Sequence, residues 1–120
     1  MIGWIGVDLD GTLAVNSDWK GPNHIGAPVP AMLQRVKKWL AEGQEVRIFT
    51  ARVAGSGKID ADGLVDDSSF ANNQRRLIQA WCEKHIGVRL KVTATKDFEM
   101  VSFYDDRCVQ VEANTGRLIV

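Results

Sequence analysis

The chain has few cysteines, no net charge and no long apolar run, and each absence excludes a class of protein. Cys82 and Cys108 are isolated, without the C-x-x-C spacing of zinc or redox sites, so we expect two buried, reduced thiols and a cytoplasmic location. A formal charge of zero gives no general attraction to nucleic acid or to an anionic membrane. No apolar run approaches the length of a membrane span, and we expect no signal peptide before the first strand.

Apolar residues are plentiful enough for a core, because they make up 45% of the 120 residues and include four tryptophans. We expect a single domain over residues 1–120. Two segments with apolar residues at helical spacing predict helices, one opened by Pro28 and Pro30 and ended by Gly43, the other capped within residues 66–68 and ended by Gly87. Short apolar runs predict strands at 2–7, 45–50, 88–92, 100–104 and 109–111.

The alternation of strands and helices predicts an α/β fold. Crossover connections between parallel strands are right-handed and carry helices onto the sheet. We therefore expect a three-layer, Rossmann-like domain with a mostly parallel five-stranded sheet and helices on both faces. Sites in such sheets lie at the carboxyl ends of the strands.

Polar residues follow three of the predicted strands at those ends. Asp8 and Asp10 follow the first strand, Thr50 closes the second, and Asp105 with Asp106 follows the strand at 100–104. Uncompensated carboxylates are costly at a buried sheet end. The pattern therefore favours one shared polar site over separate solvated turns.

The first acidic pair points to a cation. Asp8 and Asp10 stand two residues apart, and Gly11 breaks the strand after them. Two like charges this close repel unless a cation or a proton lies between them. For this pair alone, a solvated turn rich in Asp and Gly is an equal alternative.

The acidic pair belongs to the stretch D-L-D-G-T-L, residues 8–13, which resembles the first signature of the haloacid dehalogenase (HAD) superfamily. Thr50 resembles the second signature and Lys96 the third, with Lys91 as an alternative for the lysine. Tyr104-Asp105-Asp106 resembles the fourth, so the resemblance spans nearly the whole chain in the expected order. Lys96 departs from many family members, because it lies directly before the acidic strand rather than a helix earlier.

The resemblance implies a phosphatase mechanism. Asp8 would be the nucleophile that forms an aspartyl-phosphate, and Asp10 the general acid and base. Magnesium would be held by Asp8, the Asp10 carbonyl and Asp105, with Asp106 binding it directly or through water. The phosphoryl oxygens would be bound by Thr50, Lys96 and the backbone N–H groups of Leu9 and Ala51.

The gaps between the signatures hold one loop and one helix each, so the resemblance implies a minimal member without a cap domain. The loops at 14–27 and 53–67 or a second subunit would then shelter the site, which makes a homo-oligomer an expectation. Within these loops, Trp19, His24 and Arg52 are candidates for substrate contact, Arg52 for a second anionic group. For Trp19 and His24, local packing is an equal alternative.

The expected function is a magnesium-dependent phosphomonoesterase acting on a small-molecule or macromolecular phosphate ester. Alternatives within the superfamily are a phosphotransferase and a phosphatase for polynucleotide ends, although the neutral composition gives nucleic acid no support. The alternative from another class is a receiver-like phospho-acceptor module. Receivers carry the acidic pair early and the acceptor later, the reverse of the order here.

Overall fold

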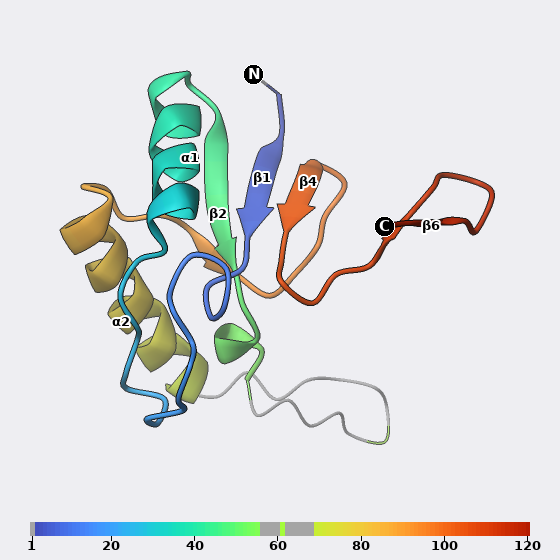
Figure 1. Cartoon of the computed structure of the whole chain (residues 1–120). Helices are drawn as coiled ribbons and strands as arrows, with labels where there is room; N and C mark the ends of the chain where they lie inside the picture. The colour runs from blue at the N-terminus through green and yellow to red at the C-terminus, as the bar shows by residue number, and fades with distance from the viewer. Residues whose placement is uncertain (1, 56–60, 62–68) are drawn as a thin grey trace.

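Six strands and two α-helices make up the described part of the chain. The computed structural model describes residues 2–55, 61 and 69–120. The elements are β1 (Trp4–Val7), α1 (Pro30–Ala41), β2 (Glu45–Phe49), the 3₁₀ turn η1 (Ala51–Val53), α2 (Ser69–His85), β3 (Val92–Thr93), β4 (Met100–Tyr104), β5 (Gln110–Val111) and β6 (Leu118–Ile119). Figure 1 shows β1, β2 and β4 side by side, with both α-helices together at one side of the strands.

Four strands form a parallel sheet in the order β3-β2-β1-β4. β1 lies between β2 and β4, with Val7 opposite Ile48 on one side and Tyr104 on the other. All four residues of β1 are buried, as expected for a strand covered on both faces. Because the strands are parallel, the carboxyl ends of β1, β2 and β4 lie at the same edge of the sheet.

One core fills the space between the sheet and both helices. Ile5 and Ile48 point from the sheet into the same cluster as Val36 of α1 and Ile78 of α2. All four are at most 8% exposed. Both helices therefore cover the same face of the sheet.

The opposite face is covered by the segment that connects β3 to β4. Trp4 is fully buried there and its indole N–H donates to Asp97 Oδ1 at 2.8 Å. The Arg47 guanidinium lies 4.5 Å from the centre of the Trp4 ring and 3.5 Å from Asp97 Oδ2. Phe49 and Phe103 pack on this face at 4.7 Å between ring centres.

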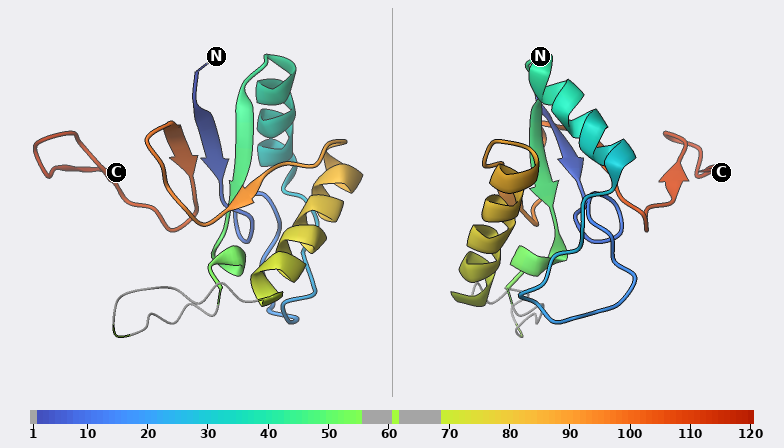
Figure 2. Two further views of the ribbon diagram at one scale, coloured as in Figure 1. Left: turned by 180° about the vertical axis from the view of Figure 1, so that it is seen from behind. Right: turned by 60° about the vertical axis from the view of Figure 1, so that its left-hand side comes forward.

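The α/β class and the parallel sheet are confirmed, but the number of strands in the sheet and the placement of helices differ from the prediction. Residues 110–111 pair antiparallel with β6 in a separate hairpin, which projects from the sheet beyond β4 (Figure 2). The sheet therefore has four strands among the described residues. The predicted strand at 88–92 is reduced to the two residues of β3.

The helix placement has a topological cause. The chain moves from β1 to β2 to β3 in one direction across the sheet, and right-handed crossovers then place both helices on one face. The return from β3 to β4 would require a helix on the other face, but residues 94–99 cross there without one. The prediction of helices on both faces is therefore wrong for the described chain.

The helix ends follow the predicted signals where they are described. α1 begins at Pro30, and Gly43 just after it has φ of +82°, the left-handed geometry typical of a glycine after a helix. The predicted cap of α2 at Asp66, Asp67 or Ser68 lies outside the described residues. Cys82 is buried as expected, whereas Cys108 is exposed. No helix in the described chain is both long and apolar enough to cross a membrane.

The core and the hairpin should respond differently to loss of an apolar side chain. Ile48 is fully buried, and Val111 in the hairpin is 52% exposed. We expect Ile48→Ala to lower the free energy of unfolding by about 2–5 kcal/mol. Val111→Ala should change it by less than about 0.5 kcal/mol. Urea unfolding followed by circular dichroism measures both, and similar losses would show that the hairpin belongs to the cooperative core.

Candidate functional site

The pairing of β1 with β4 brings two acidic segments together. The Asp8 N–H donates to the Tyr104 carbonyl at 2.9 Å, so the hydrogen bonding between the two strands continues one residue past the end of β1. Asp8 therefore lies beside Asp105 and Asp106. One carboxylate oxygen from each of the three side chains lies within 4.8 Å of the other two.

The turn after β1 holds this cluster in place. The Leu9 carbonyl accepts from the N–H groups of Thr12, Leu13 and Ala14. The Thr12 hydroxyl lies 3.3 Å from both Asp8 Oδ2 and Asp106 Oδ1, and it accepts from the Asp106 N–H at 3.0 Å.

Gly11 allows the acidic segments to approach each other. Its φ of +90° favours glycine, and a β-carbon there would overlap the Asp106 carboxylate. Steric contact with Asp106 therefore explains why a glycine occupies this position of the first signature.

The surroundings of Asp8 favour its protonated form. Burial, the negative charge of Asp105 and the contact with Asp106 together raise the pKa of Asp8 from 3.8 to about 7, and burial is the largest of these causes. No arginine or lysine of the described chain forms an ion pair with any of the three. The donor set is all oxygen and anionic, which is the chemistry that Mg²⁺ prefers. These residues therefore fit a magnesium ion.

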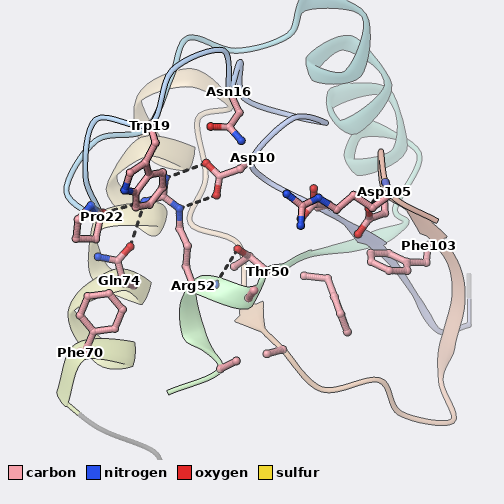
Figure 3. A pocket seen from close by; sticks show the side chains of 16 residues that line it. Asp10, Asn16, Trp19, Pro22, Thr50, Arg52, Phe70, Gln74, Phe103 and Asp105 are labelled. Carbon is pink, nitrogen blue, oxygen red and sulfur yellow. Dashed lines mark hydrogen bonds and ion pairs between the residues drawn. The ribbon is translucent and has the colours of Figure 1, made fainter. Parts of the chain in front are cut away.

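Asp10 points away from the acidic cluster. Its carboxylate accepts from Arg52 Nε at 2.7 Å and from Arg52 Nη2 at 2.8 Å, a forked ion pair that Figure 3 shows. The side chains are 23% exposed for Asp10 and 9% for Arg52. The two aspartates of the first signature thus have different partners, and the expected metal contact through the Asp10 carbonyl stays a prediction.

Thr50 lies on the same edge, at the end of β2. It is buried, and its hydroxyl accepts from the Arg52 N–H at 3.2 Å (Figure 3). Ala51 begins η1 and lines the same hollow as Thr50. Leu9 is fully buried beneath the turn after β1. The proposed phosphate-binding positions at 50 and 51 therefore border the acidic residues.

Neither of the two candidate lysines, Lys96 and Lys91, lines the hollow that Asp8 and Asp10 line. Lys96 is exposed, does not line the hollow and forms no ion pair with a described residue. Burial and then the charges of the nearby acids raise the pKa of the Cys108 thiol, and the positive charge of Lys96 acts against them. The Lys91 ammonium lies 3.8 Å from Glu45, at the beginning of β2, away from the edge where Thr50 lies.

The loop at 14–27 contributes both backbone carbonyls and side chains to the site. Arg52 donates to the carbonyls of Pro22 and His24, both at 2.8 Å. The Trp19 ring lies 5.4 Å from the Arg52 guanidinium carbon. His24 thus contributes its backbone carbonyl to the site. Most of the other predicted loop, at 53–67, lies outside the described residues.

A hollow of about 670 Å³ joins these groups. Asp8, Asp10, Thr50 and Arg52 line it together with four aromatic side chains, from Trp19, Phe49, Phe70 and Phe103. An apolar wall next to a few convergent polar groups is typical of a small-molecule site.

Two contributors were missed in the sequence. Thr12 lies in the first signature but had no assigned role. Gln74 is 1% exposed and accepts from Arg52 Nη1 at 3.1 Å. It lies four residues from both Phe70 and Ile78, so a polar residue within the apolar stripe of a helix was the available signal.

Comparison with known proteins shows the fold and no more. No protein-family model and no curated protein matches the chain. A solved structure described as a conserved protein from Bacteroides thetaiotaomicron is similar, with 18% sequence identity and a TM-score of 0.57. The similarity covers 91% of this chain and 79% of that one.

Removing one charge from the acidic cluster should stabilise the metal-free protein. Because the folded-state pKa of Asp8 is raised to about 7, its contribution to stability is present below pH 4 and is lost as the pH rises through 7. We expect Asp8→Asn in chelator at pH 8 to raise Tm by a few degrees, since about 1 kcal/mol corresponds to roughly 4 °C in a domain of this size.

The gain should disappear near pH 4, and magnesium should raise the Tm of the wild type more than that of the variant. Asp18→Asn, in the exposed part of the loop at 14–27, is the matched control with no expected gain. Differential scanning calorimetry with and without magnesium measures these shifts. A lower Tm for Asp8→Asn in chelator at pH 8 would contradict the repulsion argued from the cluster.

Proposed function

We propose that the protein is a magnesium-dependent phosphomonoesterase of the HAD type, without a cap domain. The observation that carries this proposal is the meeting of Asp8, Asp105 and Asp106 at the carboxyl edge of a parallel sheet, with ligand atoms within 4.8 Å of one another. Asp10 and Thr50 line the same hollow as Asp8. The resemblance of residues 8–13 to the first signature assigns a reaction to this arrangement.

The proposed reaction has two displacement steps. An Asp8 carboxylate oxygen attacks phosphorus, the bond from phosphorus to the ester oxygen breaks, and Asp10 donates a proton to the departing alcohol. Water then attacks the aspartyl-phosphate while Asp10 accepts its proton, which releases inorganic phosphate and restores Asp8.

Asp8, Asp105 and Asp106 would hold the magnesium ion, with the Asp10 carbonyl as the further expected ligand. When bound, the ion supplies positive charge that favours ionised carboxylates and lowers the repulsion between Asp8 and an anionic substrate. Thr50 and the backbone at Leu9 and Ala51 would bind phosphoryl oxygens.

Lys96 is our proposal for the cation that binds phosphate. Its position between β3 and β4, directly before the acidic strand, supports it over Lys91, which contacts Glu45 at the beginning of β2. A long lysine side chain reaches several ångströms from an exposed position. Lys96→Met should then raise KM for an aryl phosphate more than Lys91→Met does.

The test of the proposed function is hydrolysis of an aryl phosphate by the purified protein with magnesium. Turnover should stop in chelator and return with magnesium, whereas calcium should inhibit because its larger, looser coordination misplaces the attack. Undiminished turnover after thorough chelation would contradict the assignment. A receiver-like module would take up at most one phosphoryl group per chain.

The two aspartates of the first signature should have separable roles. Asp8→Asn should abolish turnover and leave no phospho-enzyme, because the nucleophile is lost. Asp10→Asn should slow turnover by about 10²–10⁴-fold. With an aryl phosphate, whose leaving group needs little protonation, it should slow the second step more and cause phospho-enzyme to accumulate on Asp8.

Acid quench followed by peptide mass spectrometry detects the added phosphoryl group. The Asp18→Asn variant is the control and should turn over like the wild type. Phosphorylation of another residue, or normal turnover by Asp8→Asn, would disprove the mechanism.

A further inference from the structure

Arg52 uses its whole hydrogen-bonding capacity inside the protein. A guanidinium group has five N–H donors, and the structure shows five acceptors. Nε and one donor of Nη2 bind the two oxygens of Asp10, and the other donor of Nη2 binds the His24 carbonyl at 2.8 Å. Nη1 binds the Pro22 carbonyl at 2.8 Å and Gln74 Oε1 at 3.1 Å.

These acceptors belong to three separate parts of the chain. Asp10 follows β1, Pro22 and His24 lie in the loop at 14–27, and Gln74 lies on α2. Figure 3 shows Arg52 between Asp10, Pro22 and Gln74, with the Trp19 ring beside it. The Arg52 side chain is only 9% exposed and Gln74 is 1% exposed, so both are largely removed from water. Loss of one partner would leave a buried group without its hydrogen bond, which is costly.

This arrangement argues against the expected role of Arg52 as a ligand for a second anionic group of the substrate. A substrate anion would have to displace Asp10, Gln74 or a backbone carbonyl from the guanidinium. The forked geometry instead fixes both oxygens of Asp10, and with them the direction in which the carboxylate faces.

We infer that Arg52 is a positioning residue, which orients the Asp10 carboxylate and holds the segment 22–24 against the active-site edge, with Gln74 as its anchor on α2. This inference rests on the proposed function for the role of Asp10, but not for the role of the loop. It also means that Arg52 is not the residue that would bind a second anionic group of the substrate.

The first experiment measures kcat and KM of the Arg52 variants for hydrolysis of an aryl phosphate. We expect Arg52→Gln to lower kcat by about 10²-fold, the cost of a displacement of about 1 Å in a catalytic group, with KM not raised. As in Asp10→Asn, phospho-enzyme should accumulate on Asp8, because the water that attacks it lacks a well-placed base. In the Asp10→Asn background, Arg52→Gln should cost little more.

Arg52→Lys separates geometry from charge. Lysine keeps the positive charge, but its three donors cannot reproduce the planar fork, so its kcat should stay close to that of Arg52→Gln. Full activity of Arg52→Lys would show that charge alone suffices and would overturn the inference.

The second arm needs no turnover. Hydrogen exchange read by mass spectrometry should show faster exchange in peptides covering residues 15–27 for Arg52→Gln. Gln74→Ala, which leaves Arg52 and Asp10 intact, should show a smaller increase. Arg75→Gln is the matched control, because Arg75 also lies on α2 but donates to Val92 and Asn72, away from the site. Circular dichroism checks that each variant is folded.

The two arms distinguish failure of this inference from failure of the proposed function. A wild type without phosphatase activity would remove the proposed function, and the exchange arm would still decide whether Arg52 holds the loop. Unchanged exchange in folded Arg52→Gln would overturn the inference. So would a large rise in KM with unchanged kcat, since that result is expected if Arg52 binds substrate.

Discussion

The parallel pairing of β1 with β4 is the constraint on which the rest of the site depends. It places Val7 opposite Tyr104, so the acidic residues just beyond both strands share a small volume. Burial and the repulsion by the neighbouring carboxylates both raise the pKa of Asp8, so its ionised form is costly in the folded protein. The acidic cluster therefore lowers the stability of the metal-free fold, and a divalent cation bound at this edge of the sheet would restore that stability.

The two aspartates of the first signature show how one short turn creates two environments. Asp8 lies among acids, whereas Asp10, two residues later, faces the guanidinium of Arg52. The chain direction changes at Gly11, and the bonds to the Leu9 carbonyl close the turn behind it. Two identical side chains two residues apart therefore have different partners and different electrostatic surroundings.

The sequence predicts the local elements of the fold and the site, but not the contacts between distant parts of the chain. Strand β1, its acidic end and the limits of α1 follow from apolar runs, glycine and proline, which act over a few residues. The apolar run at 109–111 predicts a fifth strand of the sheet, but in the structure it pairs with β6, because a short apolar run does not reveal its pairing partner. The strand order decides which face of the sheet each helix covers, and local periodicity does not reveal that order. The prediction of helices on both faces is wrong for this reason. The contacts of Arg52 join residues 10, 22, 24 and 74, and only the folded chain brings these together.

The position of Trp19 gives the protein an optical reporter. It is 66% exposed and lies against Arg52, whereas Trp4 is fully buried and Trp81 is 8% exposed. Soluble quenchers reach an exposed indole first, so the quenchable, red-shifted part of the emission comes mainly from the loop beside the hollow. Emission excited at the long-wavelength edge of the tryptophan band therefore samples mainly the mouth of the site, and the blue-shifted remainder reports on the buried tryptophans of β1 and α2.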